Sequence, residues 1–379
     1  MKEIYLDHAA ATPLEPAVLQ AMQPYFAEKF YNPSAVYLKS LDVAADIEDA
    51  RKRVAHWLGA KPTEIIFTSG GTEANNLAIN GVMQAYPSSN LVVSAIEHES
   101  VLAPARQYDY QEAPVTKGGL VDIVKLIKKI NDQTVLVSII YANNEVGTIQ
   151  PIREISVKLQ EIRALRQKKG NKLPLYLHTD AAQASAYLDL HTSRLGVDLM
   201  TINGGKIYGP KQTGALFVKA GVNLKPQILG GGQERGLRSG TENVPGIIGL
   251  AAALDLVQER HHEENQRLRE LQKLFIDLLT EKLPKAVING SLKHRLPNNV
   301  HVTFPEVDNE RLMMQLDEKG IRAAAGSACA ASSQEPSHVL KSMGLSDEQA
   351  QSSLRFTMGR LTTEQDIRQT VDLLAQLTA

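Results

Sequence analysis

The fold is decided by a pattern that residues 65–73, IIFTSGGTE, show most clearly. A short apolar run is followed by a glycine turn with hydroxyl groups and then by the start of a helix. Similar β-branched runs recur along the chain and alternate with longer amphipathic segments, such as residues 152–168. The runs are residues 65–67, 91–93, 135–140, 175–177, 198–202 and 215–218. This alternation predicts an α/β fold, with a mostly parallel sheet and helical crossovers.

The rhythm changes in the last third of the chain. Residues 247–283 contain no proline, and apolar residues recur there at steps of three and four, which predicts one long helix that bridges two domains. Those apolar residues are Leu268, Leu271, Phe275 and Leu278. After them come a strand at 299–304, a helix, a loop of small residues, a strand at 353–357 and a final helix, which together suggest a smaller α+β unit.

These patterns predict three parts of the chain. We expect residues 1–15 to form an N-terminal segment that packs with the small domain. Residues 16–259 form the large domain, and residues 260–379 form the small domain, with a loop of small residues at about 323–337. A chain of 379 residues is also typically long enough for two or three domains.

Composition excludes several classes of protein. Lys and Arg number 41 and Asp and Glu 42, so the formal net charge is −1, and no block of like charge supports direct binding to nucleic acid or to a membrane surface. Residues 1–8 carry acids and a histidine where a signal peptide is apolar, and no apolar stretch approaches 18 residues. We therefore expect a soluble, cytoplasmic protein. The single cysteine, Cys329, excludes an internal disulfide and a thiolate metal cluster, and we expect no metal site.

Chemistry-bearing residues follow five of the predicted strands. In an open parallel sheet, ligands bind beyond the carboxyl ends of the strands, where loops converge and helix N-termini point. The residues are a Ser-Gly-Gly-Thr turn at 69–72, His98, Asn144, Asp180 with Gln183, and Lys206. Together they offer a phosphate cup, an imidazole, amides, a carboxylate and an amine at one edge of the sheet.

Each of these residues also has an ordinary structural explanation. The turn at 69–72 and Asp180 could be helix N-caps, and Asn144 could hold a turn. His98, between two glutamates, and Lys206 could be solvated surface residues. Five such groups after five strands are far less probable as a coincidence than any one of them alone.

Phosphate cup, carboxylate and lysine in combination suit pyridoxal phosphate. This cofactor needs an amine for a Schiff base, an acid beside its ring nitrogen and donors for its phosphate. Lys206 and Asp180 fit the first two roles, and His98 is a candidate to cap a ring face. Lys211 is a rival for the Schiff base, but the turn at residues 208–210 is expected to carry it away from the strand end.

Two residues of the predicted small domain add to this set. Cys329 lies among Gly, Ala and Ser without bulky apolar neighbours, so an accessible thiol on a mobile loop is favoured over a buried small hydrophobe. Arg355 follows Ser353 and Leu354 on the predicted strand. It could be a surface charge, but its planar fork also suits a substrate carboxylate.

With these residues in place, the sequence resembles pyridoxal-phosphate-dependent cysteine desulfurases of the class V aminotransferase family. The matching stretches are residues 5–13, 68–76, 97–98, 143–147, 180–183, 206–211, 236–241 and 326–329. They span nearly the whole chain, and the last is typical of the branch with a long catalytic-cysteine loop. The resemblance implies the aspartate aminotransferase-like fold, known as fold type I, for the large domain.

The resemblance also implies roles, assigned position by position. Lys206 would form the Schiff base, Asp180 would pair with the ring nitrogen, Gln183 would contact the phenolic oxygen, and His98 would stack on the ring and move protons. The phosphate would be bound by Gly71 and Thr72 and by Thr241 from the other subunit of a homodimer. The substrate L-cysteine would be held by Asn144 and Arg355, and Cys329 would be the nucleophile that keeps the sulfur as a persulfide and leaves L-alanine.

One departure from the family pattern concerns the phosphate. Asn203-Gly204-Gly205 stands where relatives usually carry a Ser and a His that touch the phosphate. The Asn203 amide and the Gly205 N–H are candidates to substitute for them.

Some questions of function stay open at this point. The sequence leaves the sulfur acceptor open between an iron–sulfur scaffold protein, a tRNA thiolation enzyme and another carrier. A selenocysteine lyase or an aminotransferase of the same class, and a non-catalytic scaffold that has lost the cofactor, are the alternatives.

Overall fold

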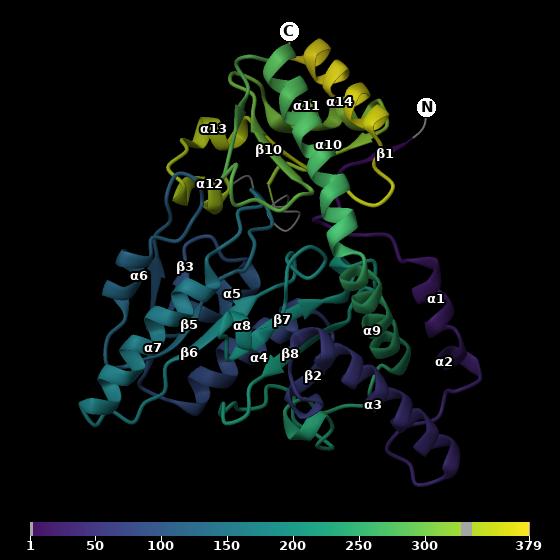
Figure 1. The fold of residues 1–379 in the computed structure, drawn as a ribbon, viewed down its shortest axis with the longest axis vertical. Coiled ribbons are helices and arrows are strands. Elements are labelled where there is room, and N and C mark those ends of the chain that lie inside the picture. The colour runs from purple at the N-terminus through teal and green to yellow at the C-terminus, as the bar shows by residue number, and fades with distance from the viewer. Residues whose placement is uncertain (1–2, 327–335, 379) are drawn as a thin grey trace.

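A computed structural model describes residues 3–326 and 336–378, and within them a seven-stranded sheet forms the centre of the larger part (Figure 1). Its strand order is β2-β8-β7-β6-β5-β3-β4, and only β8 runs against the others. The strands are β2 (Ile65–Thr68), β3 (Asn90–Ser94), β4 (Tyr110–Ala113), β5 (Thr134–Ser138), β6 (Tyr176–Asp180), β7 (Leu199–Asn203) and β8 (Gly214–Val218). The predicted mostly parallel sheet is therefore confirmed, and all six predicted runs overlap strands.

The strand that the sequence did not predict is β4, at one edge of the sheet. Its residues, Tyr-Gln-Glu-Ala, include no apolar run, and only Ala113 is buried. Three of its four side chains are at least partly exposed, so β4 lacks the apolar run that indicated the other strands, including β2, which is fully buried at the opposite edge.

Helices cover both faces of this sheet, as alternate side chains of its strands show. Val92 of β3 belongs to one buried cluster, whereas Leu91 and Val93 belong to another. The first cluster contains residues of α3 (Leu38–Leu58), α7 (Ile152–Lys168) and α9 (Val244–Glu259), and the second contains residues of α4 (Gly71–Ala85) and α5 (Glu99–Ala105). The remaining helices of this part are α1 (Pro16–Met22), α2 (Pro24–Ala27), α6 (Ile123–Lys129) and α8 (Thr192–Leu195).

The predicted single helix over residues 247–283 is wrong in one respect. The structure has two helices, α9 and α10 (His261–Lys282), separated at Arg260, whose φ of −105° and ψ of 3° depart from helical values. The pattern missed the break because Arg260 is neither Gly nor Pro. The predicted domain boundary near residue 260 falls at this break, and the division into domains stays a prediction.

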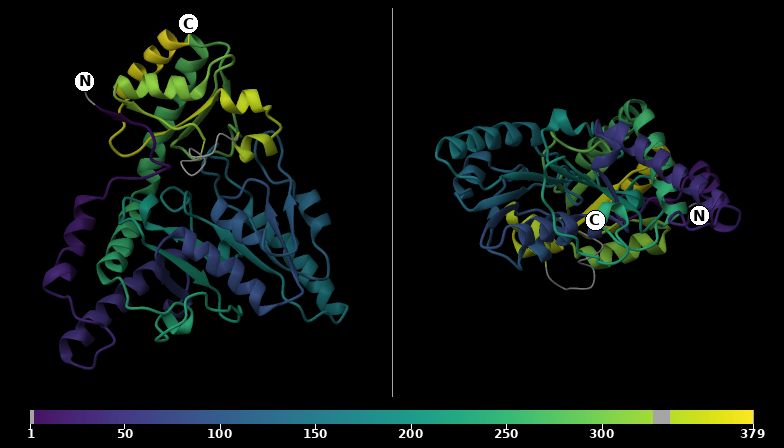
Figure 2. Two further views of the ribbon diagram at one scale, coloured as in Figure 1. Left: turned by 180° about the vertical axis from the view of Figure 1, so that it is seen from behind. Right: turned by 90° about the horizontal axis from the view of Figure 1, so that it is seen from below.

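The C-terminal part lies beyond one end of the large sheet (Figures 1 and 2). Its antiparallel sheet has the order β12-β10-β9, with β9 (Val287–Ile288), β10 (Asn299–Thr303) and β12 (Ser353–Thr357). Helices α11 (Asn309–Glu318), α12 (His338–Ser342), α13 (Asp347–Gln351) and α14 (Glu364–Leu377) accompany it. The N-terminal strand β1 (Ile4–Tyr5) pairs in parallel with β11 (Ile321–Arg322), which ties the start of the chain to this part.

No helix among the described residues is both long enough and apolar enough to cross a bilayer. Within the same residues, His, Cys, Asp and Glu form no cluster of three or more that could hold a metal ion.

Candidate active site

The carboxyl ends of β2, β3, β5, β6 and β7 meet at one edge of the large sheet, where they border a cavity of about 200 Å³. Nine of the predicted site residues line it. They are Gly71, Thr72, His98, Asn144, Asp180, Gln183, Asn203, Lys206 and Arg355. The cavity is also lined by Ala9, Ala10, Asn75, Ser100, Ile140 and Ala182, which the sequence did not single out.

Lys206 reaches the cavity from a single 3-10 turn, Gly204–Lys206, that follows β7 directly. Its Nζ donates hydrogen bonds to the carbonyl oxygens of Ala9, at 2.8 Å, and Ala10, at 2.5 Å. Lys211, the rival for the covalent bond, instead donates to the carbonyl of Thr12 and does not line the cavity. The structure therefore separates the two lysines as the turn at 208–210 predicted.

Asp180 is the last residue of β6 and is 5% exposed. Its Oδ1 accepts the N–H of Ala182 at 2.9 Å, and its Oδ2 accepts the side-chain amide of Asn75 at 2.7 Å. Asn75 lies on α4 and also donates to Ser100 Oγ at 2.8 Å. These donors stabilise the charged carboxylate and fix its direction at the cavity wall.

His98 is the N-cap of α5, where its Nδ1 accepts the backbone N–H of Ser100 at 3.1 Å. Nδ1 also lies 2.8 Å from Ser100 Oγ. Asn75 and His98 thus meet at the same serine, so the carboxylate wall and the imidazole wall of the cavity share one hydrogen-bond network.

Glu97, beside His98, is fully buried. Burial raises the pKa of its carboxyl to about 8, against hydrogen bonds from Ser94 Oγ and the Ile140 N–H, each at 2.5 Å, that lower it. The Ile140 contact joins the end of β3 to the chain after β5. Glu97 therefore holds two of the strand ends together, and it does not line the cavity itself.

The N-terminus of α4 lies where the sequence predicted a phosphate cup. Gly71 and Thr72 begin this 15-residue helix, whose first N–H groups have no partner within the helix. A Cβ atom on Gly71 would lie 3.2 Å from Asn203 Nδ2, so the Asn203 amide borders the same cup. Asn203 Oδ1 accepts the Gly205 N–H at 3.0 Å, which means that this N–H is already used within the turn.

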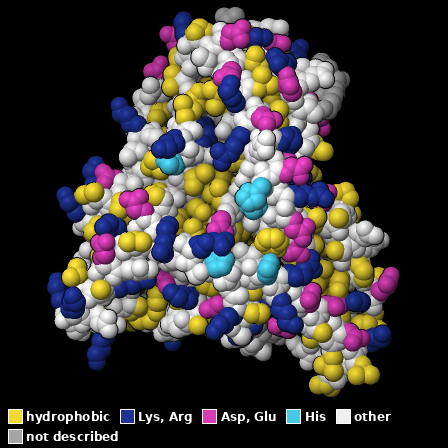
Figure 3. Space-filling view, in the orientation of Figure 1, with side chains coloured by type: hydrophobic (Ala, Val, Ile, Leu, Met, Phe, Trp, Pro, Cys, Tyr) yellow, Lys and Arg dark blue, Asp and Glu magenta, His cyan; other side chains and the backbone are white. Residues whose placement is uncertain are grey.

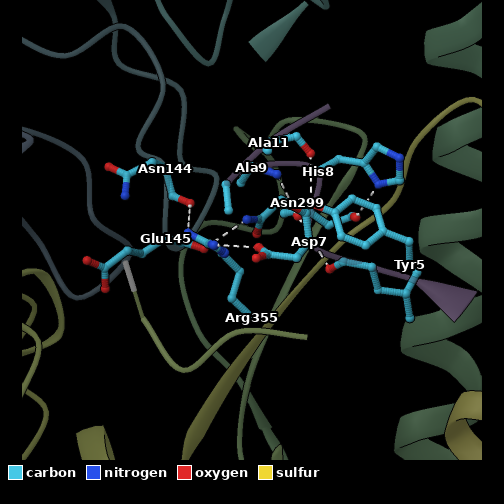
Figure 4. Close-up of polar contacts among 12 residues, drawn as sticks. Tyr5, Asp7, His8, Ala9, Ala11, Asn144, Glu145, Asn299 and Arg355 are labelled. Carbon is cyan, nitrogen blue, oxygen red and sulfur yellow. Dashed lines mark hydrogen bonds and ion pairs between the residues drawn. The ribbon is translucent and has the colours of Figure 1, made fainter. Parts of the chain in front are cut away.

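Arg355 lines the cavity from β12 of the C-terminal part, and its guanidinium lies beside Asp7 and Asn144 (Figure 4). Its Nη1 donates to the carbonyl of Asn144 at 3.0 Å, and its Nη2 donates to Asp7 Oδ1 at 2.7 Å. The buried Nε has no hydrogen-bond partner among the described residues. A buried cation that still has free N–H donors at a cavity wall is suited to an anionic ligand.

The N-terminal segment forms a wall that the sequence did not predict. Besides its contacts with Lys206, the carbonyl of Ala9 accepts Gln183 Nε2 at 2.9 Å. Tyr5 OH braces the segment from within, because it lies 2.9 Å from the carbonyls of both Asp7 and Ala11. The residues of this segment that line the cavity are Ala9 and Ala10, whose side chains are methyl groups, so no chemistry-bearing side chain marked this segment.

Two of the predicted site residues lie apart from the cavity. Gly205 does not line it, and Thr241 is an exposed residue in the loop before α9. Cys329 lies outside the described residues.

Comparisons with known proteins identify the family of the chain. The profile of the family described as "Aminotransferase class-V" matches residues 4–370. The chain belongs to the class-V aminotransferase family. A cysteine desulfurase named IscS from Dictyoglomus turgidum is 41% identical, over 99% of this chain and 94% of that protein.

Solved structures of class-V relatives show the same architecture. One described as a NifS-like protein superposes with a TM-score of 0.90 at 31% identity, over 99% of both chains. Another, described as SspA in complex with cysteine, gives a TM-score of 0.80 at 32% identity, over 94% of this chain and 99% of that one. These neighbours confirm the expected fold.

Class-V aminotransferases use pyridoxal phosphate, which confirms the cofactor expected from the sequence. The residues of this cavity fit it. Asp180 presents an oriented carboxylate, the start of α4 presents N–H groups that have no partner within the helix, and Lys206 presents an amine at the end of the neighbouring strand. A carboxylate, an anion site and an amine in one cavity match the ring nitrogen, the phosphate and the aldehyde of this group.

Proposed function

We propose that the protein is a cysteine desulfurase, which converts L-cysteine to L-alanine and retains the sulfur on Cys329 as a persulfide. The observation that carries this proposal is the meeting of Lys206, Asp180 and Arg355 at one cavity. An amine, a carboxylate and a guanidinium there suit pyridoxal phosphate together with an amino acid. The similarity to named cysteine desulfurases supplies the choice of amino acid.

In this proposal, the cofactor is held by the strand ends of the large sheet. Lys206 attaches it covalently, Asp180 pairs with its ring nitrogen, and Gln183 contacts its phenolic oxygen. Its phosphate is bound by Gly71, Thr72 and the Asn203 amide. When bound, pyridoxal phosphate withdraws electrons from the α-carbon of an attached amino acid.

The substrate is oriented by residues on the opposite side. Arg355 binds the α-carboxylate through its remaining N–H donors, and Asn144, whose carbonyl already holds Arg355, adds its side chain. The released Lys206 amine takes the α-proton. His98, whose ring is oriented by its N-cap hydrogen bond, accepts the thiol proton of Cys329.

In the next step, the sulfur of the substrate is transferred to Cys329. The Cys329 thiolate attacks the substrate sulfur, an S–S bond forms, and the bond between that sulfur and the β-carbon breaks. Its electron pair stays with the three-carbon fragment, which becomes alanine after protonation. The persulfide then passes its outer sulfur to an acceptor protein, either an iron–sulfur scaffold or a tRNA thiolation enzyme.

Exposed apolar residues support a homodimer. Figure 3 shows hydrophobic side chains on the tip of the molecule that α2 and the start of α3 form. The exposed large apolar residues from α2 to the first turn of α3 are Phe26, Phe30, Val36, Tyr37, Leu38 and Leu41. Apolar clustering of this kind is typical of protein interfaces. In the dimer, Thr241, which is exposed and away from its own cavity, completes the phosphate site of the partner; sedimentation as a monomer would contradict this arrangement.

The proposed function is tested by incubating the purified protein with L-cysteine and a reductant and by quantifying alanine and sulfide together. We expect equal amounts of both. Cys329→Ser should keep the visible absorbance of the bound cofactor and lose sulfide formation. A keto acid in place of alanine would indicate a transaminase, and sulfide release by Cys329→Ser at the parental rate would remove Cys329 from the mechanism.

A further inference from the structure

The ion pair between Asp7 and Arg355 has no role in the function proposed so far. Arg355 Nη2 lies 2.7 Å from Asp7 Oδ1, and the exposed fractions of the two side chains are 2% for Arg355 and 18% for Asp7. Figure 4 shows the Asp7 carboxylate beside the guanidinium, with the Asn144 carbonyl on another side. Arg355 lines the cavity, whereas Asp7 does not.

We propose that Asp7 is a positioning residue that holds the Arg355 guanidinium at the cavity wall for the carboxylate of the amino-acid substrate. The inference rests on the proposed function. Asp7 would act through Arg355 and would not itself touch the substrate.

The backbone of Asp7 is fixed on both sides. The preceding residue, Leu6, donates its N–H to the carbonyl of Arg322 at 2.8 Å and accepts the N–H of Thr357 at 2.6 Å. The Asp7 carbonyl accepts Tyr5 OH at 2.9 Å, and Asp7 forms a β-bridge with Thr357. Asp7 is therefore docked against the strand that carries Arg355, two residues away from it.

The backbone of Arg355 is fixed as well. Its N–H donates to the carbonyl of Ala324 at 2.7 Å, and its carbonyl accepts the Ala324 N–H at 3.2 Å. On the other side, Arg355 lies opposite His301 in β10. With both backbones held, the 2.7 Å contact restrains the long side chain, which would otherwise sample several rotamers.

The hydrogen bonds of the guanidinium leave donors for a ligand. An arginine side chain has five N–H donors, and Asp7 and Asn144 use one each on Nη2 and Nη1. The buried Nε has no partner among the described residues. A substrate carboxylate can therefore bind without displacing Asp7, and Asp7 fixes the plane in which these donors point.

The opposite possibility is that Asp7 competes with the substrate for Arg355. In that case, removing the Asp7 charge would free the guanidinium and tighten substrate binding. The absence of Asp7 from the residues that line the cavity favours positioning over competition. The two possibilities predict opposite changes in KM for L-cysteine when the Asp7 charge is removed: positioning predicts a rise and competition predicts a fall.

The test compares steady-state desulfuration of L-cysteine by the wild-type holoenzyme and by Asp7→Asn. Asparagine keeps an oxygen acceptor but loses the charge, so we expect KM for L-cysteine to rise about tenfold and kcat to change less than threefold. Asp7→Glu, which restores the carboxylate, should recover part of the loss. Glu3→Gln is the matched control. It removes an exposed carboxylate of the same N-terminal segment, one that lies 3.5 Å from Arg322 Nε, and it should leave KM for L-cysteine unchanged.

A ligand without a carboxylate separates positioning from general damage. Cysteamine has the amine and thiol of cysteine, and its dissociation constant, followed by the absorbance of the bound cofactor, should be the same for wild type and Asp7→Asn. An unchanged or lowered KM in Asp7→Asn, or equal weakening of cysteine and cysteamine, would overturn the inference. Absence of desulfuration by the wild type would instead overturn the proposed function.

Discussion

The cavity has two walls of different origin. One is formed by the strand ends of the large sheet, where side chains such as Asp180 and Lys206 present their charged groups. The other is formed by the N-terminal segment, where Ala9 and Ala10 present backbone carbonyls to Lys206. Parallel strands place their carboxyl ends at one edge by geometry alone, whereas the second wall depends on pairing between residues more than 300 positions apart, such as Asp7 and Thr357.

This difference predicts how each wall responds to substitution. Side-chain groups of the first wall can be removed singly, and each removal takes away one chemical function. Carbonyl groups of the second wall persist through any substitution, so this wall can be weakened only through the side chains that brace it. We therefore expect large effects on chemistry from the first wall and smaller effects on geometry from the second.

The largest effect should come from Lys206→Ala. Without the amine, the cofactor has no covalent attachment and the α-proton has no base, so alanine formation should fall by a factor of about 10³ or more. Borohydride reduction and peptide mapping of the wild type should place the label at position 206. Lys211→Ala is the control, because Lys211 donates to the carbonyl of Thr12 and does not line the cavity, and it should keep both the label and the activity. A label at position 211 would reverse the assignment.

The second prediction concerns Asn75, which orients the carboxylate of the first wall. Asn75→Ala removes the 2.7 Å hydrogen bond to Asp180, and a hydrogen bond to a charged group contributes about 1.5–3 kcal/mol. We expect the apparent dissociation constant for pyridoxal phosphate to rise between tenfold and a hundredfold, measured by reloading the stripped enzyme. Asn80→Ala, on the same helix but away from the cavity, should leave it unchanged.

Asn75 also illustrates what the sequence could not predict. The run at 65–73 indicated a helix there, and the structure confirmed it as α4. The Asn75 amide donates to the carboxylate of Asp180, which lies 105 positions later in the chain. This contact depends on how α4 packs across the sheet. Local periodicity carries no information on such pairs. In contrast, the positions of Asp180 and Lys206 at strand ends were predictable, because each comes within four residues of the end of an apolar run that indicates a strand.

The same limit explains the N-terminal segment. Its resemblance to a family motif marked residues 5–13, but no side chain of Ala9 or Ala10 indicated a contact with Lys206. The break at Arg260 was missed for a related reason, since a helix can end without Gly or Pro when tertiary packing redirects the chain. Sequence patterns therefore predicted the first wall, whereas the second wall became apparent only in the structure.

The third prediction tests how the second wall is braced. Tyr5→Phe removes the hydroxyl that lies 2.9 Å from the carbonyls of Asp7 and Ala11. We expect KM for L-cysteine to rise about threefold and the free energy of unfolding in urea to fall by ~1 kcal/mol, with kcat preserved. Tyr110→Phe, which loses contacts at the surface with Glu112, at 3.3 Å, and with Arg106, is the control. A large loss of kcat in Tyr5→Phe would show that the second wall takes part in chemistry.

The smallest effect should come from Glu97, which joins strand ends of the first wall without lining the cavity. Burial raises the pKa of its carboxyl from 4.5 to about 8. Between these values the folded protein binds a proton that the unfolded chain has released, so the contribution of Glu97 to stability is present below pH 4.5 and declines as the pH rises toward 8. Glutamine has no proton to lose, and Glu97→Gln should remove this decline.

The measurement is the thermal midpoint of wild type and Glu97→Gln between pH 5 and 8. We expect the midpoint of the wild type to fall across this range by about 2 °C or more relative to the variant, because each kcal/mol shifts the midpoint of a chain of this size by about 2 °C. Glu364→Gln, in an exposed pair with Arg368, should titrate in parallel with the wild type. If the thermal midpoint of Glu97→Gln also changes with pH in parallel with that of the wild type, Glu97 is ionised in the folded protein. The end of β3 and the chain after β5 would then be held by a buried carboxylate, and an opposing cation would have to be sought near Oε2, which has no partner among the described residues.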